Sequence, residues 1–440
     1  MLTSCFVPQF RGWRSACVWC AAILVIAALI GASHLEPQKQ DRDLRQRFNL
    51  KVLGPIPHPP DNQPRPERIS LGRLLFFDPI LGGERDVACG TCHHPDFAFA
   101  DGRQFGAGVS GVGLGPQRVL SGSAATGKPI APEPRNPPTI LNTAFATVNG
   151  TPSHLAAMFW DGRAIGLEGQ ALIPFANRVE MRGDAFPGSE EEAAAVTLDS
   201  LLARLRGIPE YAQLFRSAFP DEAAAVEGGG RAQLIDRSTL ARAIAAYERE
   251  LVTRNSAFDR FVAGDDSALT EVQKQGLELF FTRAKCFVCH RGPMFSNNQF
   301  MVSGVPKAGP GLAVIPGDDT GREEHTGRLA DRYKFRVPSL RNVELTAPYM
   351  HSGVFRTLEE VMEFYNGGAR PRHANVTDEL LEGVLIAPLG FEDEQLTALV
   401  QFLRSLTDPG SQLDSSLTTV PATVPSGLTP VFGVRGRGRG

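Results

Sequence analysis

One five-residue pattern occurs twice in this chain of 440 residues, as Cys89-Gly-Thr-Cys92-His93 and as Cys286-Phe-Val-Cys289-His290. Chance would supply roughly 0.002 such pentapeptides at these cysteine and histidine frequencies, so the repetition is not accidental. Two thiols one helical turn apart can add to the two vinyl groups of a haem, while the adjacent imidazole binds the iron. The two motifs therefore predict two covalently bound haem c groups, each with its motif histidine as an iron ligand.

Cysteine pairs of this kind also occur in zinc sites and in redox disulfides. A zinc ribbon needs its two pairs roughly 15–20 residues apart, whereas Cys89 and Cys286 are separated by roughly 200 residues. A thioredoxin-type pair does not require a histidine directly after its second cysteine. Covalent haem is therefore favoured over both alternatives.

The other three of the seven cysteines lie near the N-terminus, at Cys5, Cys17 and Cys20. Around them, Arg11 and Arg14 precede an apolar run at residues 16–32 that ends in small residues, which is the order of a secretory signal. An uncleaved membrane anchor is the alternative, because about 17 apolar residues are at the short limit for spanning a bilayer. We predict a signal peptide over residues 1–32 and a periplasmic protein, whose remaining four cysteines are all used by haem.

Composition indicates a globular protein with room for two domains. Hydrophobic residues make up 42% and charged residues 21% of the chain, and the formal net charge of −3 argues against nucleic acid as a partner. A membrane partner is expected only if the leader is retained. The 45 glycines and 33 prolines predict long loops.

Apolar periodicity and helix-capping residues place helices around both motifs. Helices are predicted at 66–77, from Thr270, and further along the chain at 198–205, 234–251 and 392–406. We expect a mainly α fold of two cytochrome c-like helical domains, each with one covalently attached haem, joined by long loops. The expected boundaries are an N-terminal haem domain at 45–245, a C-terminal haem domain at 246–407 and a disordered Pro/Ser/Thr-rich tail at 408–440.

Longer strings surround the motifs, among them LGRLLFFDPIL, CGTCHHPDFAFADGR, RNPPTILN, FWDGRAIGLEGQA, RVEM, FTRAKCFVCHRGPMF, FRVPSLRNVELTAPYMHSG and TLEEVMEFYNGG. In these strings, and in their order over residues 67–406, the chain resembles the bacterial di-haem cytochrome c peroxidase/MauG family. The resemblance implies that the N-terminal haem is the peroxidatic one and that the C-terminal haem transfers electrons.

The resemblance also implies which residues act on peroxide. The family's bridging tryptophan matches Trp160, and its distal Gln and Glu match Gln170 and Glu180. Glu180 would move a proton between the peroxide oxygens, Gln170 would position the oxidant, and Trp160 would carry electrons between the haems. Composition alone favours a solvated carboxylate at Glu180 and a core residue at Trp160; the family spacing favours the catalytic interpretation.

The resemblance implies Tyr365 as the sixth ligand of the C-terminal haem iron. A Met occupies this place in the peroxidases proper, and a Tyr in the MauG branch. Tyr365 also shares a helical face with Leu358, Val361 and Met362, so a plain core residue is the alternative. Met362 and Met350 are the competing ligands.

The loop after the first motif differs from that of peroxidases that need reductive activation, which resemble one another in carrying a histidine there. Residues 95–153 contain no histidine. We therefore expect the N-terminal haem to be open to peroxide without activation. The family also binds calcium between its domains, and the matching positions are Asn136, Thr346 and Pro348, whose oxygens suit this cation.

These features predict an exported di-haem peroxidase that reduces hydrogen peroxide and exchanges electrons with a partner protein through the C-terminal haem. The partner is a small electron-donor cytochrome or copper protein, or, in a MauG-like version, a protein substrate that is oxidatively modified. A non-catalytic di-haem electron-transfer cytochrome is the alternative, and it would have two saturated irons.

Overall fold

The computed structural model describes residues 43–307, 317–410 and 413–430 of a chain that divides into two compact units, 1–50 and 51–440. In the first unit, residues 43–47 are helical. The predicted signal peptide at 1–32 lies outside the described residues. Within the described ranges, no helix combines the length and the apolar character needed to cross a membrane.

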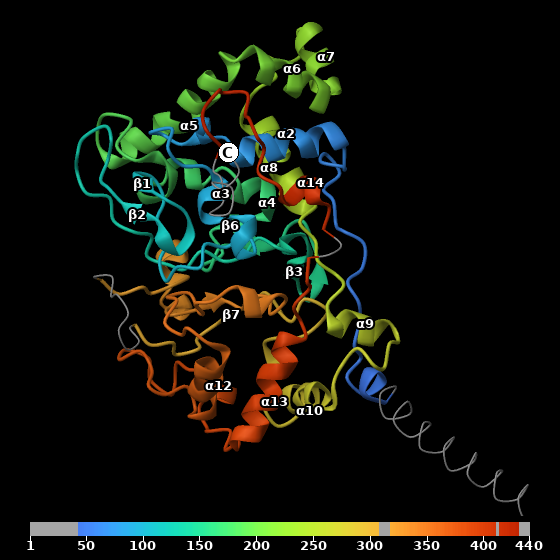
Figure 1. Cartoon of the computed structure of the whole chain (residues 1–440). Helices are drawn as coiled ribbons and strands as arrows, with labels where there is room; N and C mark the ends of the chain where they lie inside the picture. Colours follow the sequence, from blue (N-terminus) through green and yellow to red (C-terminus); the bar gives the residue numbers. More distant parts are fainter. Residues whose placement is uncertain (1–42, 308–316, 411–412, 431–440) are drawn as a thin grey trace, which may run out of the picture. The chain divides into compact units, whose positions relative to one another are not determined.

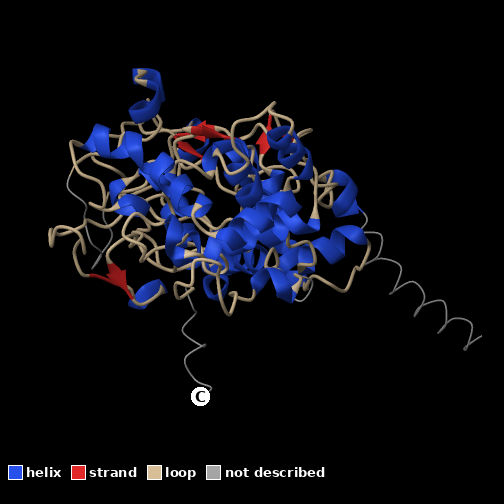
Figure 2. Cartoon of the chain, turned by 90° about the horizontal axis from the view of Figure 1, so that it is seen from above, coloured by secondary structure: helices blue, strands red, loops and turns tan. Residues whose placement is uncertain are grey.

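The second unit is mainly helical, as predicted, with little sheet (Figures 1 and 2). The helices before residue 250 are α2 (Pro66–Phe77), α3 (Cys89–Cys92), α4 (Gly166–Gln170), α5 (Glu190–Arg206), α6 (Pro209–Ala218), α7 (Pro220–Glu227) and α8 (Arg237–Arg249). Those after it are α9 (Ala257–Ala263), α10 (Glu271–Phe281), α11 (Glu323–Thr326), α12 (Leu358–Asn366), α13 (Asp393–Arg404) and α14 (Ser415–Thr418).

The strands are two residues long and form antiparallel pairs within long loops. The pairs are β1 (Gly111–Val112) with β2 (Val119–Leu120), β3 (Thr147–Val148) with β4 (Thr151–Pro152), β5 (Ala157–Met158) with β6 (Ala164–Ile165), and β7 (Phe300–Met301) with β8 (Phe335–Arg336). The first pair lies in the glycine-rich segment that follows the first motif. Such short pairs fix loop ends without building a sheet core.

Each cysteine–histidine motif follows a helix that crosses a second helix at a glycine. In the first half, α2 precedes the motif and packs on α8; in the second half, α10 packs on α13. A Cβ on Gly72 would lie 1.9 Å from the carbonyl oxygen of Ala243, and a Cβ on Gly276 would lie 1.9 Å from that of Ala398. Because a side chain does not fit at either crossing, the backbones of α2 and α8 lie in close contact at Gly72, and those of α10 and α13 do so at Gly276.

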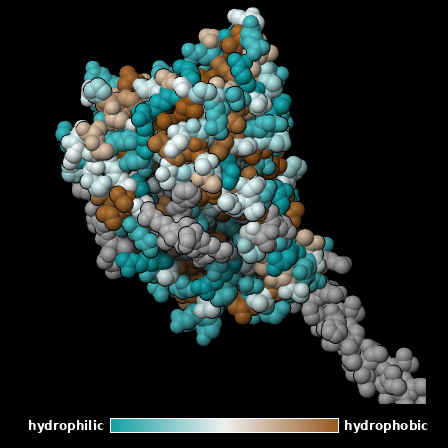
Figure 3. Space-filling model, turned by 45° about the horizontal axis from the view of Figure 1, so that its top comes forward, coloured by the Kyte–Doolittle hydropathy of each residue, from teal (hydrophilic) through white to brown (hydrophobic). Residues whose placement is uncertain are grey.

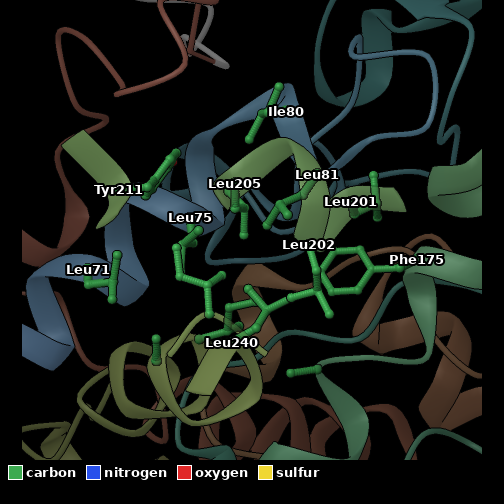
Figure 4. Close-up of a cluster of buried hydrophobic side chains, with 14 of the residues drawn as sticks. Leu71, Leu75, Ile80, Leu81, Phe175, Leu201, Leu202, Leu205, Tyr211 and Leu240 are labelled. Carbon is green, nitrogen blue, oxygen red and sulfur yellow. The ribbon is translucent and has the colours of Figure 1, made fainter. Parts of the chain in front are cut away.

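The largest core cluster joins α2, α5, α6 and α8 (Figure 4). Leu71 and Leu75 of α2 belong to this cluster together with Leu201 and Leu205 of α5, and all four are fully buried. Burial of each such side chain contributes about 1.5–3 kcal/mol. This cluster therefore holds the helices around the first motif in place.

The end of the chain differs from the predicted disordered tail. Leu413 and Leu417 pack against the cluster of Phe76, Phe77 and Tyr247, and the Tyr247 hydroxyl donates to the Leu417 carbonyl at 2.7 Å. The Pro/Ser/Thr-rich composition concealed these apolar residues, which are few but lie where they pack against a hydrophobic cluster. Residues 431–440 lie outside the described part.

The surface offers no simple indication of a partner. On the face in Figure 3, hydrophobic residues occur in small groups among hydrophilic ones. Scattered exposure of this kind is ordinary for a folded protein. Hydropathy alone therefore marks no docking surface on that face.

Candidate active site

A cavity of about 630 Å³ lies beside the first cysteine–histidine motif. This volume is in the range of cofactor pockets. The predicted residues of the N-terminal haem site all line it, namely Cys89, Cys92, His93, Trp160, Gln170 and Glu180. The structure thus brings together residues that the sequence predicted on separate segments.

Both motif histidines are oriented by a backbone carbonyl. The Nδ1 atom of His93 lies 3.1 Å from the Phe99 carbonyl oxygen, and that of His290 lies 2.8 Å from the Phe295 carbonyl oxygen. Because a carbonyl can only accept, Nδ1 carries the proton and Nε2 keeps its lone pair. Burial lowers the pKa of both imidazoles, that of His290 to about 4, so both are neutral. These residues fit an iron-ligating role, in which such a partner on the second nitrogen is usual.

Glu180 lies in a π-helical turn, Arg178–Arg182, of a kind that is frequent at functional sites. Its Oε2 atom is buried and has no hydrogen-bond partner among the described residues. Burial raises the pKa of Glu180, while the Arg163 charge and a hydrogen bond with the Asn177 side chain partly lower it. A carboxyl that is easily protonated at this place can take up and return a proton.

Trp160 contacts the first cavity and residues of the second half of the chain. Its indole Nε1–H donates to the Asn136 carbonyl at 2.8 Å, and its own carbonyl accepts from the Arg336 N–H at 2.7 Å. Its ring meets the His351 ring edge-on, with centroids 6.4 Å apart. Trp160 is thus held between this cavity and the segment at 336–351.

Tyr365, on α12, lies close to the second motif. Burial and the nearby Cys286 and Cys289 raise the pKa of its phenol. Met362 is buried on the same helix, and Met350 packs against the same hydrophobic cluster as Tyr365. The geometry therefore places the phenol near the second haem motif, as a sixth ligand requires, and the role of Tyr365 stays a prediction.

The residues matched to calcium partly converge. The Asn136 N–H donates to the His351 carbonyl at 2.7 Å, which brings Asn136 beside the turn that contains Pro348. The Thr346 hydroxyl donates to the Val343 carbonyl. No cluster of three or more His, Cys, Asp or Glu side chains suited to a metal occurs in the described ranges. A cation at this turn would therefore depend on amide and carbonyl oxygens.

Sequence reasoning missed several ionisable residues of the cavity, among them Glu133, Arg163 and Glu248. Glu133 stands between prolines in an irregular segment, and Glu248 is in a charged helical run, so both look like solvated acids in the sequence. The exposed His325 also lines the cavity. Only packing reveals these residues, because no local pattern distinguishes them.

Glu248 should make the stability of the holoprotein fall as the pH rises towards 8. Burial above all raises its pKa to about 8, although Arg249 opposes this. The folded state then holds a proton that the unfolded carboxyl releases at a pH of about 4.3, so stability is lost as pH rises towards 8. Glu248→Gln cannot ionise. Between pH 6 and pH 8 we expect wild type to lose about 2 kcal/mol of unfolding free energy that Glu248→Gln keeps.

Urea unfolding at both pH values measures this difference, with the exposed Glu227→Gln as the matched control. The control should follow wild type. Parallel pH curves for wild type and Glu248→Gln would show that Glu248 is not protonated in the folded state.

The cavity combines an oriented neutral histidine, an easily protonated carboxyl and a tryptophan, and this combination fits a peroxidase-type oxidoreductase. The family model for di-haem cytochrome c peroxidases matches residues 66–267. The methylamine utilization protein MauG of Methylorubrum extorquens is 31% identical over 403 residues, covering 91% of this chain and 95% of that protein. The cytochrome c551 peroxidase of Pseudomonas aeruginosa is 37% identical over 292 residues, covering 66% of this chain and 69% of that one.

Solved structures agree with these relatives. A MauG-like protein associated with microbial copper homeostasis has a TM-score of 0.65 at 28% identity, covering 84% of this chain and 97% of that one. The diheme peroxidase BthA from Burkholderia thailandensis shares the fold, with a TM-score of 0.55 at 22% identity, covering 86% of this chain and 97% of that one. The chain belongs to the di-haem cytochrome c peroxidase/MauG family, which confirms the family and the enzyme class predicted from the sequence.

Proposed function

We propose that this protein is an exported, periplasmic di-haem peroxidase of the MauG-like type. It reduces hydrogen peroxide at the N-terminal haem and exchanges electrons with a partner protein through the C-terminal haem. The observation that carries this proposal is the cavity of about 630 Å³, where the first motif meets Glu180 and its buried, unpartnered oxygen.

The chain's own residues supply the proton chemistry. Cys89 and Cys92 would hold the N-terminal haem and His93 would ligate its iron, which would supply the electrons for cleavage of the O–O bond. Glu180 takes a proton from one peroxide oxygen and returns it to the other, so that the leaving oxygen departs as water. The Gln170 amide orients the peroxide for this transfer.

Each haem belongs to its own helical domain in this proposal, at 45–245 and 246–407. The two glycine crossings support it, because α2 with α8 and α10 with α13 frame the two motifs alike. A calcium ion on Asn136, Thr346 and Pro348 would hold the turn at 346–351 against Asn136, which already bonds to it.

The C-terminal haem uses Cys286, Cys289, His290 and Tyr365. A phenolate oxygen is a harder donor than a Met sulfur and stabilises higher oxidation states of iron. Tyr365 and the histidine-free segment at 95–153 favour MauG-like chemistry, in which oxidising equivalents leave through Trp160 to a protein substrate. Electron supply by a small cytochrome or copper protein is the second candidate, supported by the relatives named cytochrome c peroxidase.

Adding peroxide with and without a reduced small c-type cytochrome tests this function. A long-lived oxidised spectrum that the cytochrome barely discharges indicates the MauG-like protein. Rapid, repeated oxidation of the cytochrome indicates a peroxidase with an electron donor. If peroxide changes neither the haem spectrum nor the cytochrome, the proposal fails and the electron-transfer cytochrome takes its place.

Electron paramagnetic resonance of the resting protein should show one high-spin and one low-spin ferric signal. Two low-spin signals would contradict an open N-terminal site. Tyr365→Met is expected to change the g values of the low-spin signal, because a sulfur replaces an oxygen on that iron. Met362→Leu, on the same helix, is the control and should leave them unchanged. An unaltered low-spin signal in Tyr365→Met would show that Tyr365 is not the ligand.

A further inference from the structure

A second carboxyl, that of Glu133, lines the same cavity as Glu180. We propose that Glu133 exchanges a proton with Glu180 and so connects the peroxide site with solvent. This inference rests on the proposed function, because it assigns a source to the protons that Glu180 handles.

The backbone fixes where Glu133 stands. Pro132 and Pro134 flank it, and a residue that precedes proline is restricted to extended conformations. The Glu133 N–H, the only backbone donor of these three residues, bonds to the Gly106 carbonyl at 2.8 Å. A Cβ on Gly106 would lie 3.3 Å from the Glu133 Cγ atom, so the side chain passes directly over that glycine.

Glu180 is hydrogen-bonded through its backbone to the other end of the segment at 106–109. Its carbonyl accepts from the Val109 N–H at 2.8 Å, and a Cβ on Gly108 would lie 2.2 Å from that carbonyl oxygen. Gly106 and Val109 are three residues apart, or at most about 10 Å in an extended chain. Two glutamate side chains that start from these points and line one cavity can exchange a proton directly or through one water.

Each of the two carboxyls has one oxygen without a hydrogen-bond partner among the described residues. Oε1 of Glu133 and Oε2 of Glu180 are both buried and have no hydrogen-bond partner in the described part of the chain. Buried polar atoms without a partner are rare in folded proteins and call for an explanation. We explain these two oxygens by a proton that moves between the two carboxyls.

The nearby arginines already form ion pairs with other carboxylates. Arg163 pairs with Asp161 at 2.8 Å, and Arg135 pairs with Asp161 at 2.6 Å and with Asp319 at 2.6 Å. Both arginines act on Glu133 through space, yet burial and the charge of Glu180 outweigh them and raise the pKa of Glu133 well above its usual range.

Cys92 is another ionisable group near Glu133, and it carries no charge once it is bonded to haem. Because the pKa of both carboxyls is raised and both line one cavity, the two groups can share a proton, as close acid pairs do.

This pair matches the stoichiometry of the reaction. One hydrogen peroxide, two electrons and two protons give two waters, and the electrons come from the haems. Glu180 alone can move a proton between the two oxygens, but the two further protons must come from outside. Ala131 and Pro134 beside Glu133 are exposed, so Glu133 joins the cavity to the surface.

An infrared pH titration of the holoprotein tests the pair without turnover. Wild type should show carboxylic acid bands that titrate in two coupled steps. Glu133→Gln should remove the step at higher pH and leave the Glu180 step in place, because Glu133 is already protonated and uncharged where Glu180 titrates. Glu180→Gln should move the Glu133 step to lower pH, because the Glu180 charge that raises the Glu133 pKa is gone. The exposed Glu210→Gln is the control and should titrate like wild type.

The pH profile of the peroxide reaction tests proton delivery. Glu133→Gln should remove the higher of the two titration steps from the profile and slow the reaction roughly tenfold at neutral pH. Glu133→Asp, which keeps a carboxyl, should restore most of the rate. If Glu133→Gln does not fold, a lowered Glu133 step in Glu180→Gln still establishes the pair.

The outcomes separate the two ideas. Unchanged infrared titrations in both variants overturn the pair, and an unchanged pH profile in Glu133→Gln overturns proton delivery. If the wild-type protein shows the coupled titration but does not react with peroxide, the proposed function is contradicted, whereas proton sharing between Glu133 and Glu180 is still supported.

Discussion

Glu180→Gln is expected to slow the reaction of the oxidised holoprotein with hydrogen peroxide by about 10²–10⁴-fold, the usual contribution of a general acid–base residue. Glutamine has nearly the same shape, so the cavity and the resting haem spectrum should persist. The amide cannot take the proton that peroxide must give up. Stopped-flow absorbance at several peroxide concentrations measures the second-order rate constant.

Glu210→Gln, on the exposed face of α6, is the control for this variant and should react like wild type. A Glu180→Gln protein within twofold of the wild-type rate would remove Glu180 from the mechanism. A changed resting spectrum would show instead that the substitution altered the cavity, and Glu180→Asp would then be the variant to measure.

Gly276→Ala is expected to destabilise the protein by at least ~3 kcal/mol, the upper range for forcing atoms into a packed core. The new Cβ would lie 1.9 Å from the Ala398 carbonyl oxygen and 2.8 Å from the Phe402 Cβ. Backbone atoms cannot rotate away, so α10 and α13 must move apart. Gly72→Ala should act similarly on α2 and α8, where the contact is also 1.9 Å.

Gly169→Ala in α4 is the matched control, because nothing lies within 4 Å of its would-be Cβ. A helical Gly→Ala change at an open position gains up to ~1 kcal/mol in helix propensity. Urea unfolding of the holoproteins measures all three variants. If Gly276→Ala were as stable as Gly169→Ala, the close crossing of α10 and α13 would be wrong.

The helices were predictable because their signals are local. The predicted bounds of α2 coincide with Pro66–Phe77, since an initial proline and a following Asp-Pro mark both ends, and α10 begins after the predicted cap Thr270. The convergence of Trp160, Gln170 and Glu180 on one cavity was predictable only through the family resemblance. Residues ten positions apart do not share a helix face, and along a strand they lie too far apart to line one cavity.

The parts that escaped prediction depend on contacts between distant segments. Leu413 and Leu417 looked like isolated apolar residues in a polar tail, and the hydrophobic cluster against which they pack includes side chains of α2 and α8. Glu133 becomes distinctive only beside Gly106 and Glu180. Burial of a single charge is decided by its tertiary neighbours, which neither composition nor periodicity encodes.

The central claim is that the N-terminal site is open and reacts with peroxide without prior reduction. Mixing the fully oxidised holoprotein with one equivalent of hydrogen peroxide, and recording the haem absorption spectrum by stopped flow, tests it most directly. We predict an immediate spectral change whose rate is proportional to peroxide concentration. A spectrum that stays unchanged until one haem has been reduced would contradict the claim.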